Sequence, residues 1–332
     1  MIERKVDALL ATVGLVIFAI IYGLIEAEVI GPFWKLNIII ICINVIMSVS
    51  LNLINGYTGQ FSLGHAGFMA VGAYVSVVLT AKLQLPFGLA ILAAAAAAGF
   101  VGFLIGIPTL RLNGDYLAIA TLGLCEIIRI VIMNIDYVGG AAGFTGIPRY
   151  TTFAWAFLVM LATLLFIKNF VNSAYGRACI AIRENEIAAE AMGVKVVNYK
   201  VLAFTLGAAF AGIAGALFAH CFYILMPGTF GFLQSFNYLI MVVLGGLGSI
   251  TGSIAGAIVV TGISAALAGV PEFRMIIYSL ILILLMFYRP QGLFGYVEIT
   301  NLPVFRYLKN MSPEAKKAMG MADEADGKGG RA

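Results

Sequence analysis

The sequence has few charged residues for its length. Of its 332 residues only 11% are Asp, Glu, Lys or Arg, whereas 62% are hydrophobic. Soluble domains carry roughly 25% charged and about 45–50% apolar residues, so this composition excludes an ordinary soluble domain. The apolar surplus forms repeated runs of roughly 17–22 residues, the length that crosses a bilayer as a helix.

The chain also lacks the residue patterns of several kinds of site. Its four cysteines show no metal-type spacing, and we expect packing residues without disulfides. No GxxxxGK[ST] sequence is present, and the glycine-rich run 245–252 lies between apolar segments, so we interpret it as a tight turn before closely packed glycines. The net charge of +4 is spread over loops and does not indicate nucleic-acid binding. We expect no cofactor or metal on this chain and no enzymatic activity.

The apolar runs predict an all-α, polytopic membrane bundle of about ten transmembrane helices. Backbone polar groups in lipid must bond within their own segment, so each run should be helical. We interpret the first run as a retained anchor, and we expect the glycine-interrupted third, eighth and ninth runs to be bent, broken or re-entrant. The predicted spans are 8–25, 36–54, 62–80, 87–107, 116–134, 152–169, 201–220, 232–247, 253–269 and 275–288.

The basic residues predict an orientation. With a cytoplasmic N-terminus, fifteen of the twenty Lys and Arg residues lie inside, four lie outside, and Arg129 lies within a span. Because cytoplasmic segments are enriched in basic residues, we expect the segment 172–200 and both termini in the cytoplasm. Residues 1–302 are the predicted transmembrane domain. Residues 303–332 are a polar cytoplasmic tail, with a surface helix over 304–319 as the alternative.

The loop 135–151 is the longest connection expected outside the membrane. It is rich in glycine and carries Tyr137, Phe144 and Pro148. We expect it either to cap the bundle or to dock an external partner.

The polar insert 172–200 is the most informative segment of the chain. It carries a helical pattern over 184–192 that Gly193 ends. A protein that only spans the bilayer has no use for such an insert, whereas a protein that passes a mechanical signal to a soluble partner does. A solvated loop helix is the alternative. The residues predicted to couple the chain to a partner are Gly176, Arg177, Arg183, Glu184, Glu186, Glu190 and Gly193.

Polar residues in the glycine-rich segment 55–74 form a second candidate site. In the segment 55–74, glycines alternate with Gln60, Ser62 and His65. This pattern predicts a broken helix that lines a translocation path, where freed backbone groups face water or substrate. The alternative is a kinked helix whose polar side chains bond to neighbouring helices.

Tyr116, Glu126 and Arg129 extend the candidate path into the fifth span. Glu126 and Arg129 are three residues apart, so they share a helix face and are able to pair. Charges at membrane depth usually face a bundle interior or a watery cavity. The pair is interpreted as a gate element or, alternatively, as a contact that fixes helix packing.

Four stretches of the chain resemble a known family. They are NLINGYTGQFSLGHAGFMAVGAY at 52–74, RLNGDYLAIATLG at 111–123, GRACIAIRENEIAAEAMGV at 176–194 and VVLGGLGSITGSIAGA at 242–257. In this order they resemble the LivM-type permeases of ATP-binding-cassette importers for branched-chain amino acids. The third stretch is the most specific, because it combines a coupling loop with a flank typical of the family. The general coupling motif of such permeases is only partly kept, in residues 190–193.

The resemblance implies a multi-subunit importer in the inner or plasma membrane of a prokaryote. Its partners would be a second homologous permease, two ATPase subunits that bind ATP and Mg, and an extracytoplasmic solute-binding protein. The helix around 184–192 would insert into a groove on an ATPase. Urea and short-amide importers share much of this pattern. A secondary transporter or channel without ATPases, with His65, Glu126 and Arg129 as relay groups, is the alternative class.

Overall fold

The computed structural model describes residues 18–28, 30–110, 112 and 114–269, with a few isolated residues on either side. The predicted spans 8–25 and 275–288 lie partly outside the described residues. The tail 303–332 lies outside them completely.

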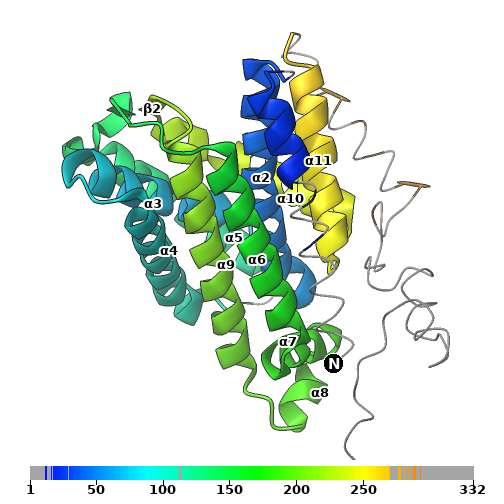
Figure 1. The fold of residues 1–332 in the computed structure, drawn as a ribbon. Coiled ribbons are helices and arrows are strands. Elements are labelled where there is room, and N and C mark those ends of the chain that lie inside the picture. Colours follow the sequence, from blue (N-terminus) through cyan, green and yellow to red (C-terminus); the bar gives the residue numbers. More distant parts are fainter. Residues whose placement is uncertain are drawn as a thin grey trace, which may run out of the picture.

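Within the described part, the chain is a bundle of helices (Figure 1). Each predicted span from 36–54 to 253–269 is occupied by a helix, which confirms the helical class. Among the described residues, six helices are long and apolar enough to cross a membrane, and two shorter apolar helices accompany them. The six are α2 (Pro32–Asn52) with its π-helical extension η1 (Leu53–Tyr57), α3 (His65–Val77) with η2 (Val78–Lys82), α4 (Phe87–Thr109), α5 (Asp115–Met133), α6 (Phe153–Asn172) and α9 (Val196–Ala219). The shorter two are α10 (Phe232–Gly245) and α11 (Ile250–Ala266).

Helix α9 lies at the centre of the packing, against α3, α4 and α2. Helix α2 in turn packs against α11 and α6, and α10 packs against α11 (Figure 1). The helices approach closely through small residues, as is typical of membrane bundles. A Cβ atom on Gly72 of α3 would lie 2.2 Å from the carbonyl oxygen of Gly212 on α9, and one on Gly215 would lie 2.0 Å from that of Met69. These contacts leave no room for a side chain at the α3–α9 crossing.

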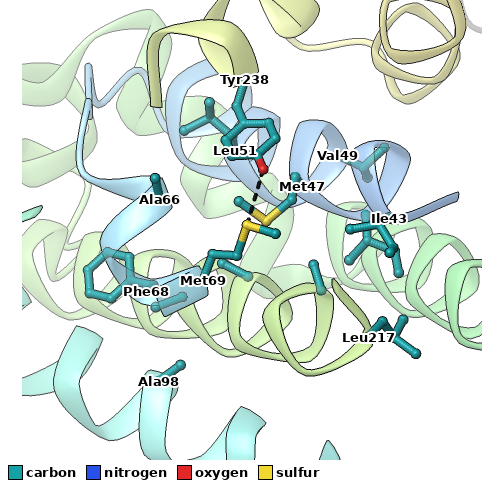
Figure 2. Close-up of a cluster of buried hydrophobic side chains, with 14 of the residues drawn as sticks. Ile43, Met47, Val49, Leu51, Ala66, Phe68, Met69, Ala98, Leu217 and Tyr238 are labelled. Carbon is teal, nitrogen blue, oxygen red and sulfur yellow. Dashed lines mark hydrogen bonds between the residues drawn. The ribbon is translucent and has the colours of Figure 1, made fainter. Parts of the chain in front are cut away.

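Large apolar side chains fill the space between α2, α3, α9 and α10 (Figure 2). Met47, Met69, Leu217 and Tyr238 are almost completely buried there. The buried hydroxyl of Tyr238 donates a hydrogen bond to the Met69 Sδ atom at 3.1 Å and accepts one from the Gln234 amide at 2.8 Å. The only polar atom of this side chain is therefore satisfied inside the core.

The glycine-rich run before α11 forms the predicted tight turn. Gly246 and Gly248 have φ angles of +119° and +81°, which residues with a side chain rarely adopt. In α11, a Cβ atom on Gly256 would lie 2.0 Å from the Met241 carbonyl oxygen. The predicted close packing of this helix through its glycines is therefore present, against α10.

Two structures mark opposite ends of the bundle (Figure 1). At one end lie α7 (Ala174–Glu184) and α8 (Glu186–Ala191). At the other end β1 (Phe144–Thr145) pairs antiparallel with β2 (Ile224–Leu225). The short 3-10 helices η3 (Asp136–Val138), η4 (Gly140–Ala142) and η5 (Pro227–Phe230) complete the connections around these strands. The loop 135–151 thus covers this end of the bundle.

Candidate functional site

The polar insert folds as two helices rather than the one helix predicted over 184–192. Asn185 separates them in an extended conformation, and its Oδ1 atom accepts a hydrogen bond from Ala188 N at 3.0 Å. This N-cap starts α8 two residues later than predicted. At the other end Gly193 has a φ angle of +84°, and its N–H bonds to Glu190 O at 2.9 Å, as the predicted terminating glycine should.

Helix α7 was not predicted from the sequence. The Ser173 hydroxyl caps its N-terminus by accepting from Gly176 N at 3.3 Å. A Cβ atom on Gly176 would lie 2.3 Å from the Val171 carbonyl oxygen, so Gly176 permits the sharp corner between α6 and α7. Arg177 is exposed and donates to Asn172 O at 2.8 Å, a contact within the same corner.

A small core of its own holds α8 in place. It consists of Ile182 of α7, Ala189 of α8 and Val196 of α9, and Tyr199 packs against both this small core and the main core. Lys200 of α9 adds an ion pair, with its Nζ atom 2.7 Å from Glu186 Oε2. The Lys200 side chain is only 8% exposed, so removing its partner would leave a charge that water solvates poorly. These contacts therefore hold together the end of α7, the whole of α8 and the start of α9, which we call the α7–α8 unit.

This unit presents two large apolar side chains outward. Ile187 is 82% exposed and Met192 85%, more than any other large hydrophobic residue in the described part of the chain. Glu184 and Glu190 are exposed beside them. The sequence analysis selected the charged residues and missed Ile187 and Met192. Their apolar character within an otherwise polar insert was the available signal.

Four of the charged residues predicted to contact a partner have side-chain bonds within the chain, namely Arg177, Arg183, Glu184 and Glu186. Arg183 donates from Nη1 to Gly56 O at 2.9 Å, and from Nε and Nη2 to Glu184 Oε1 at 3.2 and 2.6 Å. Glu186 is paired with Lys200. The guanidinium of Arg183 is therefore directed toward the bundle, and the residues that face outward are Arg177, Glu184, Ile187, Glu190 and Met192.

The second candidate site is a non-helical segment between two of the long helices. Seven residues, 58–64, separate η1 from α3, and we call them the break. Side chains replace the backbone bonds that the helix loses there. Asn55 accepts from Ser62 N at 3.2 Å and donates to Ser62 O at 3.3 Å, and Thr121 of α5 accepts from Leu63 N at 3.0 Å. The Ser62 backbone is thus fixed by hydrogen bonds inside the bundle.

Gln60 and His65 keep unused hydrogen-bonding groups in this interior. His65 is fully buried, and its Nε2 lies 2.7 Å from the Ser50 hydroxyl, whereas its Nδ1 has no partner. Gln60 is 3% exposed, and neither its Oε1 nor its Nε2 has a partner among the described residues. An unsatisfied buried polar group costs about 1–3 kcal/mol. The break therefore carries polar groups available to water, to a solute or to a different conformation.

The predicted pair of Glu126 and Arg129 is present. Arg129 Nε and Nη2 lie 2.7 and 2.6 Å from Glu126 Oε2. Glu126 Oε1 also accepts from the N–H of Phe232, the first residue of α10, at 3.0 Å. A carboxylate is stabilised by the free N–H groups and dipole at a helix N-terminus, so the pair joins α5 to α10. Tyr116 is 74% exposed and lies apart from this pair.

The structure does not join all the predicted path residues into one site. Among the described residues, no hydrogen bond links Glu126 or Arg129 to Gln60, Ser62 or His65. Thr121 connects the break to α5, and Ser235 connects the start of α3 to α10 by accepting from Ala66 N at 3.1 Å. Sequence reasoning did not select either hydroxyl residue.

Comparison with known protein families gives a match over residues 36–286. The matching family is described as "Branched-chain amino acid transport system / permease component". This range includes the break, α7, α8 and the turn before α11. No solved structure matches the chain.

Named relatives agree with the family match. The chain is 34% identical to the high-affinity branched-chain amino acid transport system permease protein LivM of Salmonella typhimurium, over 82% of this chain and 71% of the relative. It is 35% identical to LivM of Escherichia coli K12, over 76% of this chain and 67% of the relative. The permease protein LivH of Salmonella typhimurium is 25% identical, over 77% and 92%.

Proposed function

The chain belongs to the family of permease components of branched-chain amino acid transport systems, and from this premise we propose that it is the transmembrane permease of an ATP-driven importer for Leu, Ile and Val. The names of the relatives support this substrate class over urea and short amides. Relatives of both the LivM and the LivH type match, which supports pairing with a second homologous permease. Two separate ATPase subunits and an extracytoplasmic binding protein complete the proposed complex.

We place the complex in the inner or plasma membrane of a prokaryote. The proposed topology has ten helices, with both termini and the α7–α8 end in the cytoplasm. The excess of basic residues on that side supports it, as does the position of α7 and α8 at the end opposite β1 and β2 (Figure 1). In this orientation an ATPase reaches α8 and a binding protein reaches the other end.

The exposure of Ile187 and Met192 is the observation that carries the proposal. A short helix with apolar side chains pointing outward from a supported unit fits insertion into a groove of a partner protein. ATP binding would then close the two ATPases and displace α8 as a rigid body. The bundle exchanges outward-open and inward-open states because ATP and the loaded binding protein favour them differently.

The test is a charge placed at the proposed contact. Ile187→Glu and Met192→Glu should insert normally, because neither residue is buried in the bundle. Each should weaken ATPase binding by about 2 kcal/mol or more, which is about thirtyfold, because apolar anchors dominate such interfaces. Co-purification of the ATPase subunits and leucine uptake should both be lost in reconstituted membranes.

Tyr223→Glu is the matched control. Tyr223 is a 57% exposed aromatic residue next to β2, at the opposite end of the bundle. This variant should keep its ATPase subunits. Wild-type ATPase co-purification and uptake in both α8 variants would contradict the proposed function.

A further inference from the structure

Arg183 connects two parts of the chain that are far apart in sequence. It lies near the C-terminus of α7, and its Nη1 atom donates to the carbonyl oxygen of Gly56 in η1, 127 residues away. Four residues after Gly56 lies Gln60, whose side-chain amide has no hydrogen-bond partner among the described residues. The contact therefore joins the α7–α8 unit directly to η1, just before the break begins.

Two glycines leave the space that the Arg183 side chain occupies. A Cβ atom on Gly59 in the break would lie 3.0 Å from Arg183 Cγ, and one on Gly248 would lie 2.6 Å from Arg183 Nη1. Both glycines have positive φ angles, +69° and +81°. Arg183 is thus enclosed between the break and the α10–α11 turn, and a side chain on either segment would displace it.

Asn52, the last residue of α2, binds the same α10–α11 turn. Its Oδ1 atom accepts from Gly248 N at 2.8 Å, and its Nδ2 atom donates to Ser249 O at 3.0 Å. A Cβ atom on Gly56 would lie 1.9 Å from Asn52 Oδ1 and 2.3 Å from Gly248 N. We call Asn52, Gly56, Gly59, Arg183 and Gly248 the junction. It brings η1, the break, the α10–α11 turn and α7 together with almost no free volume.

We propose that Arg183 is a positioning residue that transmits the displacement of the α7–α8 unit to the break and to the α10–α11 turn. The proposal rests on the proposed function and adds an internal connection to it. Glu184 holds the guanidinium on the side of the loop, while Gly56 and Gly248 hold it on the side of the bundle. Closely packed groups do not deform continuously, so a shift of α7 moves all three segments together.

The neighbouring Gln60 gives this movement a chemical consequence. Its amide is buried and unsatisfied in the present arrangement, directly after Gly59 at the junction. A displacement of Gly59 changes the surroundings of the Gln60 amide. The polar groups of the break are thereby coupled to the position of the loop helices.

The test uses the complete complex with leucine and the leucine-loaded binding protein. In Arg183→Gln the ATPase subunits should still co-purify, because α8 and its exposed residues are unchanged. Stimulation of ATP hydrolysis by the loaded binding protein, and leucine uptake, should each fall roughly tenfold or more, within the usual range of coupling free energies. Arg183→Lys should lose less, because a lysine keeps the charge but not the planar fork that reaches Gly56 and Glu184 together.

Lys195→Gln is the matched control, since Lys195 is an exposed basic residue between α8 and α9 that lies outside the junction and outside the proposed ATPase contact. It should leave stimulation and uptake unchanged. Gly248→Ala provides an independent variant, because the added Cβ atom displaces the Arg183 guanidinium without altering Arg183 itself. It should reproduce the loss of stimulation with the ATPase still bound.

The inference is overturned if Arg183→Gln keeps stimulation and uptake within about twofold of wild type, or if it loses the ATPase subunits. The first result shows that the contact transmits nothing. The second shows that Arg183 serves docking or folding. If the wild-type protein itself neither binds ATPase subunits nor imports leucine, the proposed function fails instead, and the two failures are distinguishable.

Discussion

The two ends of the bundle are held by different means. At the β1–β2 end, Val138, Ile147 and Leu225 belong to the main hydrophobic core. At the other end, α8 packs on a small core of its own around Ala189, which the main core does not include. An element built into the main core moves with the bundle, whereas an element on a separate core is able to move relative to it. The first end is therefore fixed to the main core, and the second is the end at which the proposed complex receives force from an ATPase.

A cation at each end shows the same difference. Lys82 donates to the Tyr137 carbonyl and lies 3.3 Å from the centre of the Tyr137 ring, so it fastens the loop 135–151 to the end of η2. Arg183 bonds to Gly56 and is enclosed by Gly59 and Gly248, which lie on two other segments. One cation stabilises a cap, and the other connects a loop to the interior.

The largest loss of stability is expected when a methyl group is added at the β1–β2 end, in Gly143→Ala. Gly193→Ala adds the same group at the α7–α8 end for comparison. Both glycines have a φ angle of +84°. A Cβ atom on Gly143 would lie 2.5 Å from the Leu225 carbonyl oxygen, whereas one on Gly193 would meet nothing within 4 Å. Gly143→Ala should cost about 3 kcal/mol from crowding and backbone strain, and Gly193→Ala only about 1 kcal/mol. Thermal unfolding of the purified complexes in detergent measures both, and equal losses would contradict the difference between the ends.

The Glu126–Arg129 pair, which joins α5 to α10, should give the next largest loss of stability. Glu126→Gln weakens the bonds to Arg129 and to Phe232 N together, and Arg129→Gln removes only the first. In a double-mutant cycle on unfolding, we expect a coupling energy of about 0.5–3 kcal/mol. Additive losses would show that the two charges do not depend on one another.

Replacing either residue of the Glu186–Lys200 ion pair in the α7–α8 unit should lower stability, but by different amounts. Glu186→Gln leaves the 8% exposed Lys200 without its carboxylate, whereas Lys200→Met leaves a 44% exposed Glu186 in contact with water. We expect Glu186→Gln to cost about 1–3 kcal/mol and Lys200→Met less. Hydrogen exchange should rise in residues 186–192, with little change near β1 and β2. Faster exchange at both ends would show that the α7–α8 unit is not separate.

The smallest expected effect is the labelling of the native Cys179 of α7 by maleimide. Its side chain is fully buried, and burial raises the pKa of the thiol to about 11. At pH 7 only about one thiol in ten thousand is therefore ionised, and since the thiolate is the nucleophile, Cys179 should resist maleimide. A cysteine at the exposed position of Met192 should react readily, and its reaction should rise with pH near the ordinary thiol pKa. Fast labelling of wild-type Cys179 would show that α7 opens.

Local patterns allowed much of the fold to be predicted. Apolar runs located the helices from 36–54 to 253–269, because length and hydrophobicity decide a membrane helix within its own segment. The glycines likewise indicated the break and the turn before α11. The ends of the loop helices were predicted less well, because α8 starts at a cap made by the Asn185 side chain.

Contacts across the chain limited what could be predicted about the site. Arg183 was predicted to contact a partner protein, and its bond to Gly56 could not be predicted because the two residues are 127 apart in the sequence. Glu126 and Arg129 are three apart on one helix, so their pairing followed from helix geometry alone. Tyr116 was placed on the path, but which way a side chain on α5 faces depends on the packing of the whole bundle.

The most direct test of the coupling role of α8 is photo-crosslinking in the assembled complex. A photoreactive residue replaces Met192 in α8 in one variant and Thr145 in β1 in the other, and both positions are exposed. The account predicts a crosslink from position 192 to an ATPase subunit, and none from position 145. Absence of the ATPase crosslink at position 192, or its appearance at position 145, would contradict the assignment of the α7–α8 end as the coupling surface.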